Sequence, residues 1–117
     1  MRDREDLGPP AFHDLVSVDK TVHEPARLAI LTALSACASA DYVFLQRLTG
    51  LVSGSLTQHL ARLEEAGLVT IAKGFSGKYP QTTVTVTDRG RAAIDAHWER
   101  MTAVRKAVAR WRTATEG

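Results

Sequence analysis

Between Ser53 and Gly67 the chain reads SGSLTQHLARLEEAG. Leu56, Leu60 and Leu63 recur at spacings of four and three residues, so they lie along one face of an α-helix. Serine caps helix N-termini with its hydroxyl, and glycine ends helices because it adopts φ > 0 without a Cβ penalty. The stretch therefore predicts an amphipathic helix with Ser53 as N-cap and Gly67 at its end. One face of the helix is expected to pack against the protein core, and the other is expected to face a binding partner.

The outer face of this predicted helix carries short polar side chains that both donate and accept hydrogen bonds. Such side chains match base edges in the major groove of DNA, where Gln58 would pair with adenine, and Arg62 could reach a guanine or a phosphate. Taken alone, an ordinary polar surface helix explains this face equally well. The residues of this helix that we expect to contact DNA are Ser53, Ser55, Thr57, Gln58 and Arg62.

The segments before this helix also have helical patterns. A short helix is expected from Ala11 to about Lys20, and a strong, largely buried helix from Pro25 to about Ser39. Asp41 is a good N-cap for a short amphipathic helix that ends at Gly50. The apolar side of this helix is formed by Tyr42, Phe44, Leu45 and Leu48. Two short helices joined by a tight connection, the second with a polar outer face, form a helix-turn-helix.

After Gly67 the hydrophobic pattern changes from helical to alternating. Residues 68 to 73 and residues 83 to 87 read as two strands, separated by a loop at residues 74 to 80 that is rich in turn residues. A hairpin with a basic tip directly after a helix-turn-helix predicts a wing, although a solvated basic hairpin would look the same. The wing residues expected to contact DNA are Lys73, Lys78 and Tyr79.

The last segment predicts a long helix from Asp88, as N-cap, to about Arg112. Ile94 and the apolar residues that follow it form a stripe along the whole helix, and this stripe is too long for a small domain to cover by itself. The simplest partner is a second copy of the chain, although the first turns, near Ile94, would fold back on the protein's own core. The residues expected at a dimer interface are Trp98, Met101, Val104, Val108 and Trp111.

Composition bounds the remaining possibilities. The chain has 117 residues, 44% of them hydrophobic and 24% charged, which suits one soluble domain, at residues 11 to 117. Residues 1 to 10 are rich in charge and end in Gly8, Pro9 and Pro10, so we expect a flexible leader there. Residues 1 to 24 hold three basic and six acidic groups, a balance of −3, so the net charge of +2 leaves +5 for the rest. A basic body suits an anionic partner. With no apolar run long enough to span a membrane, no secretory signal and a single cysteine, Cys37, we expect a cytoplasmic protein.

The order of these motifs resembles the winged-helix transcriptional regulators related to the MarR and ArsR families, and most closely the small single-domain MarR-like group. The motifs are PARL at 25–28, LTQHL at 56–60, LEEAGLV at 63–69, PQTT at 80–83 and VTDRGR at 86–91. The resemblance covers about residues 23 to 98 and implies a dimeric, sequence-specific DNA-binding regulator, usually a repressor. Val52, Ser53 and Ser55 depart from the group's usual residues around the glycine that opens the recognition helix, so its base preference does not carry over.

No pattern in the sequence predicts catalysis or a metal. Ser55 and His59 stand at i and i+4, but no orienting carboxylate or nucleophile-elbow glycine accompanies them. The four histidines lack ligand spacing, and the paired cysteines of ArsR-type metal sites are missing because Cys37 stands alone. We expect no enzyme activity, no metal and no cofactor.

The sequence therefore predicts a mainly α fold with a small β-hairpin, a winged helix-turn-helix with a long C-terminal dimerisation helix. The expected function is that of a homodimeric regulator that binds an inverted repeat in double-stranded DNA, and the resemblance implies that this regulator is a repressor. The alternative is a winged-helix protein-interaction module without DNA specificity of its own. A small-molecule effector could bind near Phe12, Trp98 and Met101, where aromatic and flexible apolar groups gather.

Overall fold

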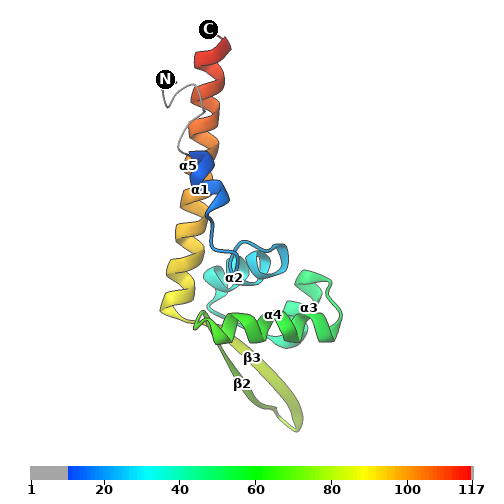
Figure 1. Ribbon diagram of the computed structural model, residues 1–117. Helices are drawn as coiled ribbons and strands as arrows, with labels where there is room; N and C mark the ends of the chain where they lie inside the picture. Colours follow the sequence, from blue (N-terminus) through cyan, green and yellow to red (C-terminus); the bar gives the residue numbers. More distant parts are fainter. Residues whose placement is uncertain (1–10, 117) are drawn as a thin grey trace. The chain divides into compact units, whose positions relative to one another are not determined.

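The computed structural model describes residues 11 to 116, and the predicted leader at residues 1 to 10 lies outside them. The described helices are α1 (Ala11–Val16), α2 (Pro25–Cys37), α3 (Tyr42–Thr49), α4 (Ser53–Glu65) and α5 (Asp88–Glu116), and the strands are β1 (Ser39–Asp41), β2 (Val69–Ser76) and β3 (Tyr79–Val86). In Figure 1 these helices and strands are coloured in chain order, from blue at α1 to red at the end of α5. Residues 20 to 95 form one compact unit, and the described residues on either side of this range form a second. The prediction of a mainly helical winged helix-turn-helix with a long C-terminal helix is confirmed.

The ends of α2 and α3 are set by their flanking residues. The Glu24 carboxylate accepts a hydrogen bond from the amide of Arg27 at 2.9 Å and so caps α2, while the Asp41 carboxylate accepts one from Phe44 at 2.8 Å and caps α3. Gly50 ends α3 with φ of +69°, so the predictions for Asp41 and Gly50 are confirmed. α2 stops at Cys37, before the expected end at Ser39, because Ala38 takes φ of +67° and the chain then enters β1.

The sheet has three antiparallel strands in the order β1-β3-β2, one more than the predicted hairpin. The added strand, β1, pairs Ser39 with Thr85. The predicted loop at residues 74 to 80 is wrong, because β2 and β3 remain paired as far as Ser76 and Tyr79. The turn shrinks to Gly77 and Lys78, with Gly77 at φ of +63°. The wing is therefore a long ribbon with a tight tip, as Figure 1 shows.

The core of the unit at residues 20 to 95 is built from one apolar face of each element. Ile30, Leu31 and Leu34 of α2 are fully buried, which confirms α2 as a central helix. The buried cluster comprises Val22, Ile30, Leu31, Leu34, Leu45, Leu56, Leu60, Leu63, Leu68, Val69, Val84, Val86 and Ile94. Burial of these side chains is what fixes the orientation of α4 and of the base of the wing.

The junction between β3 and α5 is tightly packed. Thr87, and not Asp88 as predicted, caps α5, because its hydroxyl accepts a hydrogen bond from the amide of Gly90 at 3.0 Å. The same hydroxyl donates to the carbonyl of Gly67 at 2.7 Å. A Cβ at Gly90 would lie 2.0 Å from the carbonyl oxygen of Leu68. The helix can start in this direction only because residue 90 has no side chain.

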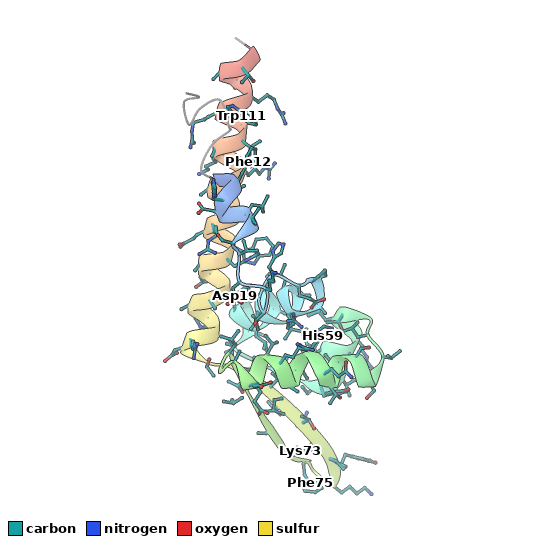
Figure 2. All side chains as sticks on the ribbon, viewed as in Figure 1. Phe12, Asp19, His59, Lys73, Phe75 and Trp111 are labelled. Carbon is teal, nitrogen blue, oxygen red and sulfur yellow. The ribbon has the colours of Figure 1, made fainter. Side chains whose placement is uncertain are left out.

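The second unit contains α1 and the larger part of α5. α1 ends at Val16, earlier than the predicted Lys20, and α5 continues to Glu116, beyond the predicted Arg112. The rings of Phe12 and Trp111 meet edge to face with their centroids 5.4 Å apart, and both are labelled in Figure 2.

Candidate nucleic-acid interface

α4 presents the two faces that its sequence predicts. Leu56, Leu60 and Leu63 are buried, while Gln58 and Arg62 are exposed. Ser53 and Thr57 are also exposed and lie on the flank of α4 that faces the wing, whereas Ser55 is half-buried on the opposite flank. The five residues predicted to contact DNA therefore do not form one stripe, and Gln58 is central among them.

The prediction that Ser53 caps α4 is wrong. The N-cap is Val52, which has no side chain able to cap, and Ser53 is already the first residue of the helix. From that position its hydroxyl does not bond the first-turn amides and instead lies 2.8 Å from the hydroxyl of Tyr42. The start of the recognition helix is held by a side chain of α3.

The hydroxyl of Tyr42 makes two more contacts with α4, to the carbonyl oxygen of Ser53 at 2.7 Å and to the hydroxyl of Thr57 at 3.1 Å. Sequence reasoning placed Tyr42 only on the apolar side of its helix. The available signal was the spacing of Ser53 and Thr57, which puts both hydroxyls on one side of α4. Next to these groups lies a groove of about 560 Å³ between α4 and the wing, lined on the wing by Lys73 and Thr82.

On the other side of α4, His59 joins a cluster with the start of α2, and it is labelled between these helices in Figure 2. The guanidinium of Arg27 lies 3.0 Å from Nδ1 of His59 and donates to the backbone carbonyls of Lys20 and Thr21. The Glu24 carboxylate lies 3.5 Å from the same His59 nitrogen. The cluster connects α4 to α2. It also engages the side chain of His59, the histidine that stands four residues after Ser55.

The carboxyl of Glu24 keeps its charge in this cluster. Burial disfavours the charged form, but hydrogen bonds from the amides of Arg27 and Ala26, together with the charges of His59 and Arg27, outweigh it and lower the pKa of Glu24 below 4.5, its ordinary value. Sequence reasoning missed this cluster, because it joins residues 32 positions apart. The only sign of the cluster in the sequence was Arg27, an arginine within an otherwise apolar helix.

The wing carries its predicted cations at different places. Lys73 lies within β2, paired with Thr82, while Lys78 lies in the turn with its ammonium 5.9 Å from the centre of the Tyr79 ring. Tyr79 is 68% exposed. Phe75, which we did not single out, is 74% exposed and lies on the same face of β2 as Lys73. Figure 2 labels Lys73 and Phe75 toward the free end of the ribbon.

The residues predicted for dimerisation differ in exposure. Trp98 is 46% exposed and Trp111 38%, whereas Val104 is buried. Met101 and Val108 are half-buried. The largest apolar side chains of the stripe thus remain accessible along α5.

The described residues contain neither a metal-binding group of side chains nor a membrane-spanning helix. No three histidine, cysteine, aspartate or glutamate side chains between residues 11 and 116 are grouped so that they could hold a metal ion. No helix within the same range has the length and apolar character needed to cross a membrane.

The chain resembles several known proteins in sequence or in structure. It is 30% identical over 75 residues to an uncharacterized protein of Methanocaldococcus jannaschii, a match that spans 64% of this chain and 82% of that protein. Its structure resembles a transcriptional regulator homologue from Pyrococcus horikoshii OT3, with 25% identity, a TM-score of 0.78, and coverage of 86% of this chain and 98% of the other. It also resembles AbfR in an overoxidized form bound to DNA, with 26% identity, a TM-score of 0.62, and coverage of 72% and 64%.

Residues 26–104 match the family described as "Winged helix DNA-binding domain". This family and the regulator homologue from Pyrococcus horikoshii OT3 support a DNA-binding regulator. The match spans more than half of the chain and includes α2 from its second residue, α3, α4 and the whole wing. The protein therefore belongs to the winged-helix DNA-binding domain family, and its resemblance to MarR-like transcriptional regulators is confirmed.

Proposed function

We propose that the chain is a cytoplasmic, homodimeric transcriptional repressor that binds an inverted repeat in double-stranded DNA. The observation that carries this proposal is the exposed polar face of α4, centred on Gln58, beside a wing that bears Lys73 and Lys78. A polar helix face suits base edges and flanking cations suit phosphates. The net charge of +5 on residues 25 to 117 favours the same anionic partner.

In this proposal α4 and the wing contact different parts of the DNA. α4 enters the major groove, while the wing contacts the flanking backbone or the minor groove. The residues assigned to the groove are Ser53, Ser55, Thr57, Gln58 and Arg62, and those assigned to the wing contacts are Lys73, Lys78 and Tyr79.

The second copy is proposed to pack along α5, where the large apolar side chains of the stripe are accessible. A two-fold dimer would place its recognition helices on half-sites about 34 Å apart, one turn of DNA. The residues assigned to this interface are Trp98, Met101, Val104, Val108 and Trp111.

The test is a fluorescence-anisotropy titration of the full chain with a pool of genomic DNA fragments at low and moderate salt, followed by sequencing of the bound fragments. Enrichment of an inverted repeat, with affinity that falls steeply as salt rises, supports the proposal. A reporter gene placed behind the enriched sequence then distinguishes repression from activation. Failure of the chain to bind any fragment at low salt would contradict the proposal.

A second candidate function, a protein-interaction module, is favoured by the surface of α3. Phe44 and Leu48, which the sequence placed on the buried side of this helix, are 48% and 45% exposed, and neighbouring Val43 is 54% exposed. Exposed apolar groups of this size are common at protein interfaces. If Val43→Ser still bound a protein partner and Gln58→Ala did not, that partner would bind α4 and not α3.

A small-molecule effector near Phe12, Trp98 and Met101 is a further part of the proposal. The accessible indole of Trp98 would report such binding by a change in fluorescence. A compound that changes this signal in the wild type, but not in Met101→Ala, and that lowers operator affinity would support an effector at this place.

A further inference from the structure

Tyr42 is the shared hydrogen-bond partner of two hydroxyls on the recognition helix. Its Oη lies 2.7 Å from the carbonyl oxygen of Ser53, 2.8 Å from Oγ of Ser53 and 3.1 Å from Oγ1 of Thr57. These contacts come from the first residue of α3 to the first and fifth residues of α4. They sit at the end of α4 that the proposed function places in the major groove.

Counting protons decides the direction of each hydrogen bond. A tyrosine hydroxyl has one proton to donate and can accept two hydrogen bonds. The carbonyl oxygen of Ser53 can only accept, so the proton of Tyr42 goes to that oxygen. The hydroxyls of Ser53 and Thr57 must then donate their own protons to Tyr42 Oη. All three contacts are satisfied only in this arrangement.

A serine or threonine hydroxyl that has given its proton away retains lone pairs for a further partner. In the major groove, hydrogen-bond donors are the exocyclic amino groups, N6 of adenine and N4 of cytosine, whereas guanine O6 and N7, thymine O4 and the phosphate oxygens only accept. We propose that Tyr42 determines DNA specificity by fixing the hydroxyls of Ser53 and Thr57 as acceptors, so that they select adenine or cytosine amino groups.

This inference rests on the proposed function, and it makes Tyr42 a positioning residue because it acts through the two hydroxyls. For Thr57 to donate to a phosphate or to a guanine, it would have to leave Tyr42 and lose one hydrogen bond. That loss corresponds to a factor of about 2 to 10 in binding. The network thus disfavours contacts in which these hydroxyls would donate, whether to a phosphate or to a base acceptor.

The test uses the operator selected by the full chain. In the half-site, each adenine is replaced in turn by purine, which lacks the 6-amino group, and each cytosine by 2-pyrimidinone, which lacks the 4-amino group. Anisotropy titrations then compare wild type, Tyr42→Phe and Thr57→Val on the same set of duplexes. Because each duplex is compared across proteins, any effect of the altered base on the duplex itself cancels.

The wild type should lose about 3- to 10-fold in affinity at one or two of the altered bases, and both variants should lose sensitivity at those same bases. Thr113→Val is the matched control, since it removes a threonine hydroxyl that donates within its own helix, to the carbonyl of Ala109, and it should keep the wild-type pattern of sensitivity. Thr57→Val preserves the test if Tyr42→Phe does not fold, which a thermal melt will reveal.

The outcomes separate this inference from the function on which it rests. If the wild type selects an operator but no amino group matters, or if Tyr42→Phe is as sensitive as the wild type, the inference is wrong and the proposed function stands. If the wild type selects no DNA at low salt, the proposed function fails and the inference fails with it.

Discussion

Single side chains on the outer face of α4 should decide which base pairs are preferred. Gln58 is exposed at the centre of this face, and a glutamine that pairs with adenine in two hydrogen bonds contributes about 1 to 3 kcal/mol of discrimination. Gln58→Ala should therefore lower the preference for one base pair by that amount while binding to random DNA changes little. Competition titrations with single-base operator variants measure this preference. An equal loss on operator and random DNA would contradict the assignment.

At the same scale, Glu24 should give the fold a dependence on acid. Because the pKa of Glu24 is lower in the folded chain than its ordinary value of 4.5, the charged carboxylate contributes stability that is fully present above pH 4.5. This contribution is lost as the pH falls through the folded-state pKa. Glu24→Gln should therefore unfold at a lower temperature than the wild type at pH 7, and the difference should narrow toward pH 3.

Melting curves of the two proteins at a series of pH values test the Glu24 prediction. Asp95→Gln is a suitable control, since it removes one exposed carboxylate outside the cluster with His59 and Arg27. A difference between wild type and Glu24→Gln that is the same at pH 7 and pH 3 would show that shape, and not charge, is responsible.

Residue-level predictions from sequence succeeded where a local rule was enough. Asp41 caps its helix and Gly50 and Gly67 take positive φ, because these roles depend only on neighbouring residues. Ser53 and Thr87 show the limit, since a shift of one residue in the helix start changes which side chain caps it. The contacts of Tyr42 and of Arg27 could not be predicted, because they join separate helices.

At the scale of elements, the entry into α5 depends on a close approach between two backbones. A methyl group at Gly90 would meet the carbonyl of Leu68 at 2.0 Å, so the strand or the helix would have to move. Gly90→Ala should destabilise the fold by roughly 3 kcal/mol or more. Gly54→Ala is the control, because nothing lies within 4 Å of a Cβ there and alanine favours a helix by up to about 1 kcal/mol.

Chemical denaturation of both glycine variants measures these changes in the free energy of unfolding. The expected order of stability is Gly54→Ala at or above the wild type and Gly90→Ala well below it. A Gly90→Ala protein as stable as the wild type would mean that the junction is looser than the packing indicates.

The wing as an element should contribute affinity without sequence preference. Lys78 lies at the tip of the ribbon, and loss of one phosphate contact reduces the slope of log affinity against log salt by about 1. Lys78→Ala should weaken binding to all sequences alike and flatten the salt dependence by this amount. Lys106→Ala makes the same change in charge on α5 and should leave the slope unaltered.

Elements with strong periodicity were predicted correctly, and those that depend on distant pairing were not. The leucine spacing of α4 identified its buried face, because one helix face must enter the core. β1 was missed, since three residues carry no alternation and the strand exists only through its pairing with β3. The length of the wing was underestimated because Gly74 and Pro80 read as loop residues, although cross-strand pairing continues past both.

For the whole molecule, the central prediction is a dimer through α5. Trp98 is 46% exposed, so a charge there would not be buried in a single chain but would be buried in the proposed interface, at a cost of several kcal/mol. Trp98→Glu should sediment as a monomer and bind a full operator far more weakly than the wild type. Arg110→Glu, at an exposed position on the face of the same helix that points away from the whole stripe, should remain a dimer.

Sedimentation velocity decides between these states, and the operator supplies an independent check. Inserting half a helical turn between the half-sites should remove most of the affinity of the wild type, because the two recognition helices would then face opposite sides of the DNA. The same insertion should matter little to a monomeric Trp98→Glu protein. A wild type that is monomeric at operator-binding concentrations would contradict the dimer.

The strand order β1-β3-β2 also bears on solubility. Within the described chain, β2 pairs only with β3, so its outer edge presents free backbone groups that could recruit a strand from another molecule and start aggregation. Lys73 stands in the middle of that edge strand and is exposed, and charged side chains of this kind hinder such pairing. A change at Lys73, which we assign to DNA, would therefore also alter this edge, which makes Lys78 the cleaner position for measuring the contribution of the wing.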